Sequence, residues 1–450
     1  MTIAKQSLIT FVLLGIAVPA GAQTTTSLPP YANRPTWTGF YIGAAFGAGA
    51  MVDRVDTSVA GAGFTIDGAG GSGVLGSIYG GIDYRILPRA VVGLLAEVSW
   101  AGFQSSASAQ VLGANAGVTT RADLGWAALA RAGVLASPST LLYLIGGYTG
   151  QNFHTDGFAA AGGATANFSN NATLNGWTVG GGLESMLWGG WSGKLEYRYS
   201  QFERRLLPGT SIGVQPATQV VRAGLTYHFG GLGAAEADEP AAPPVATNWT
   251  GFYAGVAGGG GAGVNRASAT FGGASAALDG GGQSLLGSVF GGFDYQFAPQ
   301  ALVGVMGDFT WASLQSTASV FGGGNIATVS ARADRTWSAM ARLGFLPTPS
   351  TLVYAAGGYA GENINATATA AVGGASAFAS QDMTVQGWTV GPGIETVVTG
   401  GWTTRLEYRY SQFEQKQVLS GISVQPSSHT IRAGLSYKFG VGAPPPKGSE

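Results

Sequence analysis

Two similar segments of the chain, 190–202 and 401–413, carry acids and bases at alternate positions. In the first segment, Glu196 lies between Lys194 and Arg198 on one face of a predicted β-strand, because successive side chains of a strand point to opposite faces. Leu and Tyr residues occupy the other face. A carboxylate between two cations can form buried ion pairs or line a pore. The second segment has the same pattern, with Arg405, Glu407 and Arg409.

No other set of residues predicts catalysis or metal binding. Residues 209–213 match G-x-S-x-G, but a nucleophilic serine needs a strand–turn–helix context that is missing here. The chain has no Cys, and His154, His228 and His429 are scattered, so neither a metal site nor a cofactor is expected. His228 is expected to be solvated near the end of its strand. The sequence therefore predicts no enzyme.

Period-two alternation predicts eight strands in the first half of the chain, separated by short and long connections in strict alternation. An even number of strands, with short turns at one end and long loops at the other, is typical of an outer-membrane β-barrel. The chain ends and the linker would then lie on the short-turn, periplasmic side. The expected strands are 37–47, 73–86, 90–101, 122–136, 139–150, 173–188, 190–203 and 217–229.

The charged residues of these strands fall on the face opposite the apolar stripe. A charged side chain facing lipid at mid-bilayer costs about 2–4 kcal/mol for Arg or Lys, so these residues are expected to point into the lumen. An eight-stranded barrel is just wide enough for side chains to fill, which favours an ion-pair network over a pore lining. The expected lumen charge network of the first half is Asp83, Glu97, Asp123, Arg131, Glu184, Lys194, Glu196, Arg198 and Arg222. In the second half it is Asp294, Asp308, Asp334, Arg342, Glu395, Arg405, Glu407, Arg409 and Arg432.

The chain consists of two copies of one unit. The segment WTGFY at 37–41 recurs at 249–253, and the Trp residues at 100, 126, 177 and 191 return at 311, 337, 388 and 402. A net charge of −1 excludes the basic excess of a nucleic-acid binder. The expected segments are a signal peptide (1–22), a lead-in (23–36), copy one (37–230), a Pro/Ala-rich periplasmic linker (231–248), copy two (249–440) and a tail (441–450).

Each copy resembles the porin-like, immunogenic outer-membrane proteins of alphaproteobacteria, which are related to OmpA-like eight-stranded barrels. The motifs are at 37–41, 80–84, 195–199 and 222–229. The resemblance implies an outer-membrane location, contact with lipid and lipopolysaccharide, and recognition of a closing β-signal by the barrel-assembly machinery. The β-signal residues would be Arg222, Gly224, Tyr227 and Phe229, and in copy two Arg432, Gly434, Tyr437 and Phe439.

The chain departs from the family pattern in two ways. Family members usually carry one barrel that ends near the closing Phe, whereas here there are two copies and further residues follow Phe439. Pro392 lies inside a predicted strand of copy two, where it should mark a β-bulge, because every strand of a closed barrel pairs on both sides.

These patterns predict an all-β protein of two tandem eight-stranded transmembrane barrels, with a structural and surface-exposed role in the cell envelope and at most a narrow pore. One alternative is a single sixteen-stranded porin-type barrel that conducts small solutes. Another is a surface adhesin, a ligand binder or a barrel enzyme that acts through the long loops.

We expect signal peptidase to cleave after Ala22. Lys5, the apolar stretch 8–18 and the sequence PAGA at 19–22 form the three parts of a secretory signal. Amino-terminal sequencing of the protein from outer membranes should begin at Gln23. A mature protein that still begins at Met1 would contradict export by this route.

Overall fold

A computed structural model describes residues 37–59, 62–111, 114–161, 163–206, 213–229, 248–271, 274–322, 324–372, 374–419 and 422–439. The predicted signal peptide, lead-in and tail, and nearly all of the linker, lie outside these residues. Among the described residues no helix is long and apolar enough to cross a membrane.

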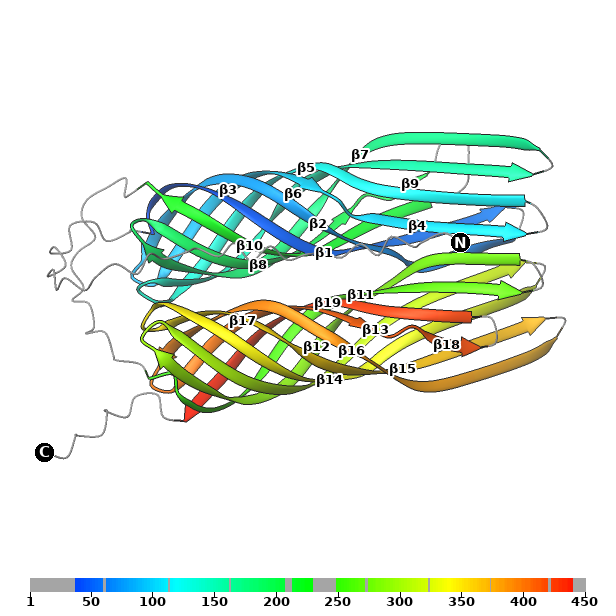
Figure 1. Ribbon diagram of the computed structural model, residues 1–450. Helices are drawn as coiled ribbons and strands as arrows, with labels where there is room; N and C mark the ends of the chain where they lie inside the picture. The colour runs from blue at the N-terminus through cyan, green and yellow to red at the C-terminus, as the bar shows by residue number, and fades with distance from the viewer. Residues whose placement is uncertain are drawn as a thin grey trace, which may run out of the picture. The chain divides into compact units, whose positions relative to one another are not determined.

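Copy one forms a closed ring of antiparallel strands (Figure 1). β3 and β4 are parts of one long strand, since both pair with β5, and β8 and β9 both pair with β10. The ring therefore has eight long strands. Its elements are β1 (Gly39–Val59), β2 (Ala62–Leu87), β3 (Ala90–Ala101), β4 (Gln104–Val111), β5 (Ala114–Ser137), β6 (Thr140–Ala161), β7 (Ala164–Trp188), β8 (Trp191–Phe202), β9 (Arg205–Leu206) and β10 (Gly213–His228).

Copy two repeats this ring. β17 and β18 both pair with β19, so its elements also make eight long strands. They are β11 (Gly251–Phe271), β12 (Ala274–Ala298), β13 (Ala301–Gly322), β14 (Asn325–Thr348), β15 (Thr351–Val372), β16 (Ala375–Thr399), β17 (Trp402–Phe413), β18 (Lys416–Leu419) and β19 (Ile422–Phe439).

The first and last strands of each copy pair with each other. β1 pairs with β10 from Tyr41↔His228 to Asp56↔Gly213. β11 pairs with β19 from Phe252↔Phe439 to Ala269↔Ile422. The prediction of two eight-stranded barrels is confirmed, and the single sixteen-stranded barrel is wrong, because that barrel would need β1 to pair with β19. We call the two rings barrel one (β1–β10) and barrel two (β11–β19).

The strands are longer than predicted at the end with the long connections. β1 continues to Val59 and β2 begins at Ala62, where the sequence predicted a long loop between residues 47 and 73. These stretches are rich in Ala, Gly, Ser and Thr, and they lack the apolar alternation by which a strand is recognised. Their backbone groups nevertheless pair across the hairpin, so the expected loops are mostly extensions of the barrel.

Pro392 does not mark a bulge, contrary to the prediction. Val390 pairs with Tyr410 and Gly393 pairs with Glu407, so the register on both sides of the proline is the same. Pro lacks an N–H group, and the pairing of β16 with β17 is interrupted at positions 391 and 392, but neither strand has an extra residue there. The bulges lie elsewhere, with register shifts between Ala122 and Gly125 and between Ala333 and Arg335.

Two aromatic rows border an apolar band on the outward face of each barrel. On β7, Trp177 and Trp188 mark the two rows and are 46% and 58% exposed. They are eleven positions apart, which is roughly 26–30 Å along the axis of a barrel whose strands tilt by about 35–45°. Exposed members of the rows include Trp100, Trp126, Tyr148, Tyr84, Trp191 and Phe229 in barrel one, and Trp311, Trp337, Tyr359, Trp388, Tyr295, Trp402, Tyr437 and Phe439 in barrel two.

We expect residues 1–230 to fold without copy two, because β1 and β10 close the ring. In unheated detergent gels this truncated protein should migrate faster than after boiling. A matched chain that ends at residue 203 lacks β10 and should be degraded, since an open sheet edge is not tolerated in lipid. If residues 1–230 fail to fold while the full chain folds, the strands of the two copies must depend on one another.

Candidate functional site

The centre of the lumen of barrel one is filled by a buried ion-pair network. Arg131 on β5 is 5% exposed, and its Nη1 donates to Oε2 of Glu184 on β7 at 2.7 Å. Its Nη2 donates to the carboxylate of Asp83 on β2. Oε1 of Glu184 accepts a hydrogen bond from Ser192 at 2.5 Å and lies 3.1 Å from Nε2 of His228. Strands from all around the ring therefore converge on one carboxylate–guanidinium centre.

A second centre surrounds Glu196 on β8. Its Oε1 accepts a hydrogen bond from Nε of Arg198 at 2.6 Å, and its Oε2 accepts one from the hydroxyl of Tyr143 at 2.7 Å. Arg198 also lies 3.1 Å from Glu97 on β3, which pairs in turn with Arg222 on β10. All four charged groups are buried, so each charge depends on its partners for stabilisation.

Lys194 contacts both an aromatic ring and a carboxylate. Its Nζ lies 3.6 Å from the centre of the Tyr79 ring and 3.7 Å from Glu196. Gly224 gives this pair room, because a Cβ at this position would lie 3.0 Å from the Tyr79 hydroxyl and 3.1 Å from Cε of Lys194. One glycine of the expected β-signal thus also has a packing role in the lumen.

Barrel two repeats the network at equivalent positions. Arg342 binds Asp294, with Nε to Oδ1 at 2.8 Å, and Glu395 at 3.0 Å. Arg409 binds Glu407 at 2.5 Å. Asp308 binds both Arg409 and Arg432, and the hydroxyl of Tyr354 donates to Glu407. The guanidinium of Arg405 lies 3.3 Å from the centre of the Phe290 ring.

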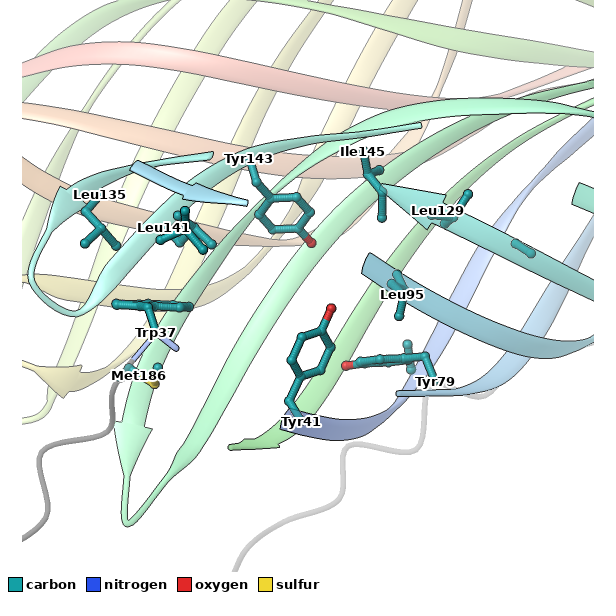
Figure 2. Close-up of a cluster of buried hydrophobic side chains, with 13 residues drawn as sticks. Trp37, Tyr41, Tyr79, Leu95, Leu129, Leu135, Leu141, Tyr143, Ile145 and Met186 are labelled. Atoms are coloured by element: carbon teal, nitrogen blue, oxygen red, sulfur yellow. The ribbon is translucent and has the colours of Figure 1, made fainter. Parts of the chain in front are cut away.

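A tryptophan that precedes the first strand closes the short-turn end of each lumen. Trp37 is 2% exposed, and its indole N–H donates to the carbonyl of Pro138 at 3.1 Å. Figure 2 shows Trp37 with Leu141 on one side and Met186 on the other. Trp249 repeats this arrangement in barrel two with a bond to the carbonyl of Pro349 at 3.0 Å.

An apolar layer closes the opposite side of the network. In barrel one, Phe153 and Phe202 pack edge to face with their ring centres 5.2 Å apart. The buried cluster also contains Met51, Leu75, Phe103, Leu174 and Val220. In barrel two, the corresponding strands contribute buried Leu286, Leu314, Ile364, Val385 and Phe413. Each network therefore lies between an apolar layer and a tryptophan-capped end.

Two residues of the predicted network lie outside it, and this part of the prediction is wrong. Asp123 is exposed, and Asp334 pairs with Arg332 at 2.5 Å on a half-exposed surface. The bulges between Ala122 and Gly125 and between Ala333 and Arg335 insert one residue, which shifts the alternation of faces. Counting alternate residues along the strand from Arg131 or Arg342 therefore assigns the wrong face to Asp123 and Asp334.

Several lumen residues were not predicted. His228, expected to be solvated, is 7% exposed, contacts Glu184 and lies beside Trp37 at a ring-centre distance of 5.7 Å. Lys438 replaces it in barrel two and binds Asp294 at 2.5 Å. Both share the parity of Arg222 or Arg432, which is the signal that could have identified them. Glu362, buried beside Thr336, shares the parity of the inward Tyr354 on β15, so the same alternation could have identified it.

The outward members of the predicted β-signals lie in the aromatic row at the short-turn end. Phe229 is 63% exposed, and the ring of Tyr227 lies 5.2 Å from that of Trp191. Tyr437 and Phe439 have the same exposed placement in barrel two. Gly434 faces inward, where a Cβ would lie 3.2 Å from both Phe290 and Arg405. Among the described residues, no cluster of His, Asp and Glu side chains could hold a metal ion.

Comparison with known proteins identifies the family. The outer membrane protein beta-barrel domain matches residues 9–229 and again residues 231–439, so the chain belongs to this family and contains its domain twice. The 31 kDa outer-membrane immunogenic protein of Brucella melitensis is 28% identical over 215 residues, which cover 45% of this chain and 90% of that protein. This confirms the resemblance inferred from the motifs.

Solved structures of outer-membrane proteins also match. The attachment invasion locus protein Ail of Yersinia pestis is 13% identical, with a TM-score of 0.23, over 42% of this chain and 99% of its own. The toluene transporter TodX of Pseudomonas putida is 11% identical, with a TM-score of 0.24, over 88% of this chain and 90% of its own.

We expect Glu184→Gln to destabilise barrel one by about 3 kcal/mol or more, because the buried Arg131 and His228 would lose a charged partner. Denaturant titration, followed by the shift between the folded and unfolded gel bands of residues 1–230, measures the effect. The matched Asp123→Asn variant removes a carboxylate outside the network and should change the free energy of unfolding by less than about 0.5 kcal/mol. Equal effects of the two variants would contradict the assignment of the network.

Proposed function

We propose that the protein is a non-conducting structural component of the outer membrane that displays two barrels to the cell exterior. The supporting observation is the filled lumen. Along the axis of each barrel, a buried tryptophan, a buried ion-pair network and an apolar layer follow one another. Ions that cross the barrel would have to displace all three.

The ion-pair network serves stability in this proposal. A pore lined by charges needs solvated side chains, whereas Glu184, Glu196, Glu395 and Glu407 are 0% exposed. Their oxygens accept hydrogen bonds from side chains two strands away, so the network links strands that do not pair with each other. Removal of one charged residue of the network would lower the stability of the barrel and would not by itself open a path for ions.

The orientation follows from the connections. The short turns, the linker and both ends of each barrel would face the periplasm, and the extended hairpins would face outward, as in outer-membrane barrels generally. The half-buried Tyr227 and the exposed Phe229, Tyr437 and Phe439 would then be available to the barrel-assembly machinery during insertion. The outward apolar bands would contact the lipid and lipopolysaccharide of the membrane.

We expect the purified full-length protein to produce no stable current steps in planar lipid bilayers. The Phe153→Ala/Phe202→Ala variant, which thins the apolar layer of barrel one, should also be silent, because the ion-pair network and Trp37 still block the lumen. A sixteen-stranded porin preparation measured under the same conditions is the positive control. Stable, porin-sized steps from the wild-type protein would refute the proposed function.

A further inference from the structure

The hairpin extensions of barrel one contain a concavity that is separate from the ion-pair network of the lumen. It has a volume of about 550 Å3 and lies against β4, β5, β6 and β7. This volume lies within the range of roughly 300–1,000 Å3 that is usual for small-molecule sites. Phe158 on β6, one of its lining residues, follows Tyr148 of the aromatic row by ten residues, or roughly 25 Å along the barrel axis. The concavity is therefore well outside the apolar band.

The pairing of the strands brings polar side chains onto one face at this site. Thr119 pairs with Asp156, and Asp156 pairs with Ser169 on the next strand. Two residues further along, Phe158 pairs with Asn167. Because residues directly opposite each other share a face, as do residues two apart in a strand, these five side chains belong to one surface.

The ring of Phe158 forms a platform on this surface. It pairs with Gly117, and a Cβ at that glycine would come within 2.6 Å of the ring, so the ring covers the glycine. Phe158 is nevertheless 45% exposed. A large apolar ring that is held against the sheet and still exposed can receive another apolar surface from solution.

Asp156 is held next to this platform. Its side chain is 44% exposed and lies 3.1 Å from Nε2 of His154 and 3.5 Å from Nη1 of Arg121. These contacts orient the carboxylate but leave it accessible as a hydrogen-bond acceptor. Thr119, Asn167 and Ser169 add hydroxyl and amide groups that can both donate and accept.

We propose that this surface binds a neutral saccharide. The C–H face of a sugar ring would stack on Phe158, and its hydroxyl groups would bond to Asp156 and the neighbouring hydroxyl and amide groups. A peptide strand would add to a sheet edge and not to this face, because the backbones of β4, β5, β6 and β7 already pair with one another across the concavity. A polyanion fits less well because the carboxylate of Asp156 offsets the nearby cations.

Barrel two provides an internal comparison, because the same positions have lost the features of the site. The Thr328–Thr369 pair stands where barrel one has the Gly117–Phe158 pair. The Ser330–Thr367 pair stands where barrel one has the Thr119–Asp156 pair. Neither the platform nor the carboxylate is present there. The inference goes beyond the proposed function, because a sealed lumen neither requires nor excludes a saccharide on the extension.

Saturation-transfer difference NMR on the full-length protein tests the proposal. The detergent must lack a sugar head group, so lauryldimethylamine oxide replaces maltosides. One set of probes consists of cellobiose, lactose and N,N′-diacetylchitobiose, and the other is a neutral, phosphate-free O-chain oligosaccharide released from lipopolysaccharide. Transfer to the first set alone indicates a free glycan, and transfer to the second alone indicates the saccharide of the membrane. Either result supports the proposal.

The variants locate the binding site. Phe158→Ala and Asp156→Asn should each reduce the transfer at least fivefold, whereas Phe158→Tyr should retain it. Phe378→Ala removes a ring that is 71% exposed in barrel two and is the matched control, with no expected effect. The gel shift on heating verifies that each variant is folded. No transfer from the wild-type protein to any probe, or equal transfer to wild type and a folded Asp156→Asn variant, would overturn the proposal.

Discussion

The width of an eight-stranded ring is the constraint on which the rest of the structure depends. Strand number sets the diameter of a barrel, and eight strands leave room for side chains but for little else. Charges placed inside so narrow a ring lose their hydration and must be compensated by opposite charges and hydrogen bonds. Arg131 with Glu184, and Arg342 with Glu395, meet this requirement in the two barrels. Closure of each copy on itself thus determines the chemistry of its interior.

Much of this arrangement could be predicted from the sequence, because successive side chains alternate between the two faces over the whole length of a regular strand. Parity placed Glu97, Glu196 and Arg222 on one side, and the structure brings these residues together in one network. The prediction failed for Asp123, where a bulge inserts one residue and reverses the faces. A bulge depends on pairing with both neighbouring strands, so a single strand read alone does not reveal it.

The ends of the strands and of the lumen were harder to predict for a different reason. Small residues such as those at 48–59 show no apolar alternation, although their backbone groups pair as well as those of larger residues. Trp37 precedes the first strand, and its inward position depends on a turn carbonyl, that of Pro138, about a hundred residues away in sequence. Such long-range contacts arise only when the ring closes.

The two copies differ at a few buried charged positions. Barrel two has Lys438 where barrel one has His228, Glu362 where barrel one has Gln151, and Asn265 where barrel one has the buried Asp53. These differences do not cancel one another, whereas the central ion pairs Arg131–Glu184 and Arg342–Glu395 are present in both barrels.

The most direct test of the account is disulfide cross-linking of the full-length chain, which has no native Cys. Ala44 pairs with Leu225, and Val256 pairs with Leu435. Neighbouring residues of paired strands have Cα atoms about 4.5–5.5 Å apart, within the range for a disulfide. Cysteine pairs at 44/225 and at 256/435 should cross-link on oxidation, and pairs at 44/435 and at 225/256 should not. Cross-links only in the second set would show that the copies share one ring and would contradict the account.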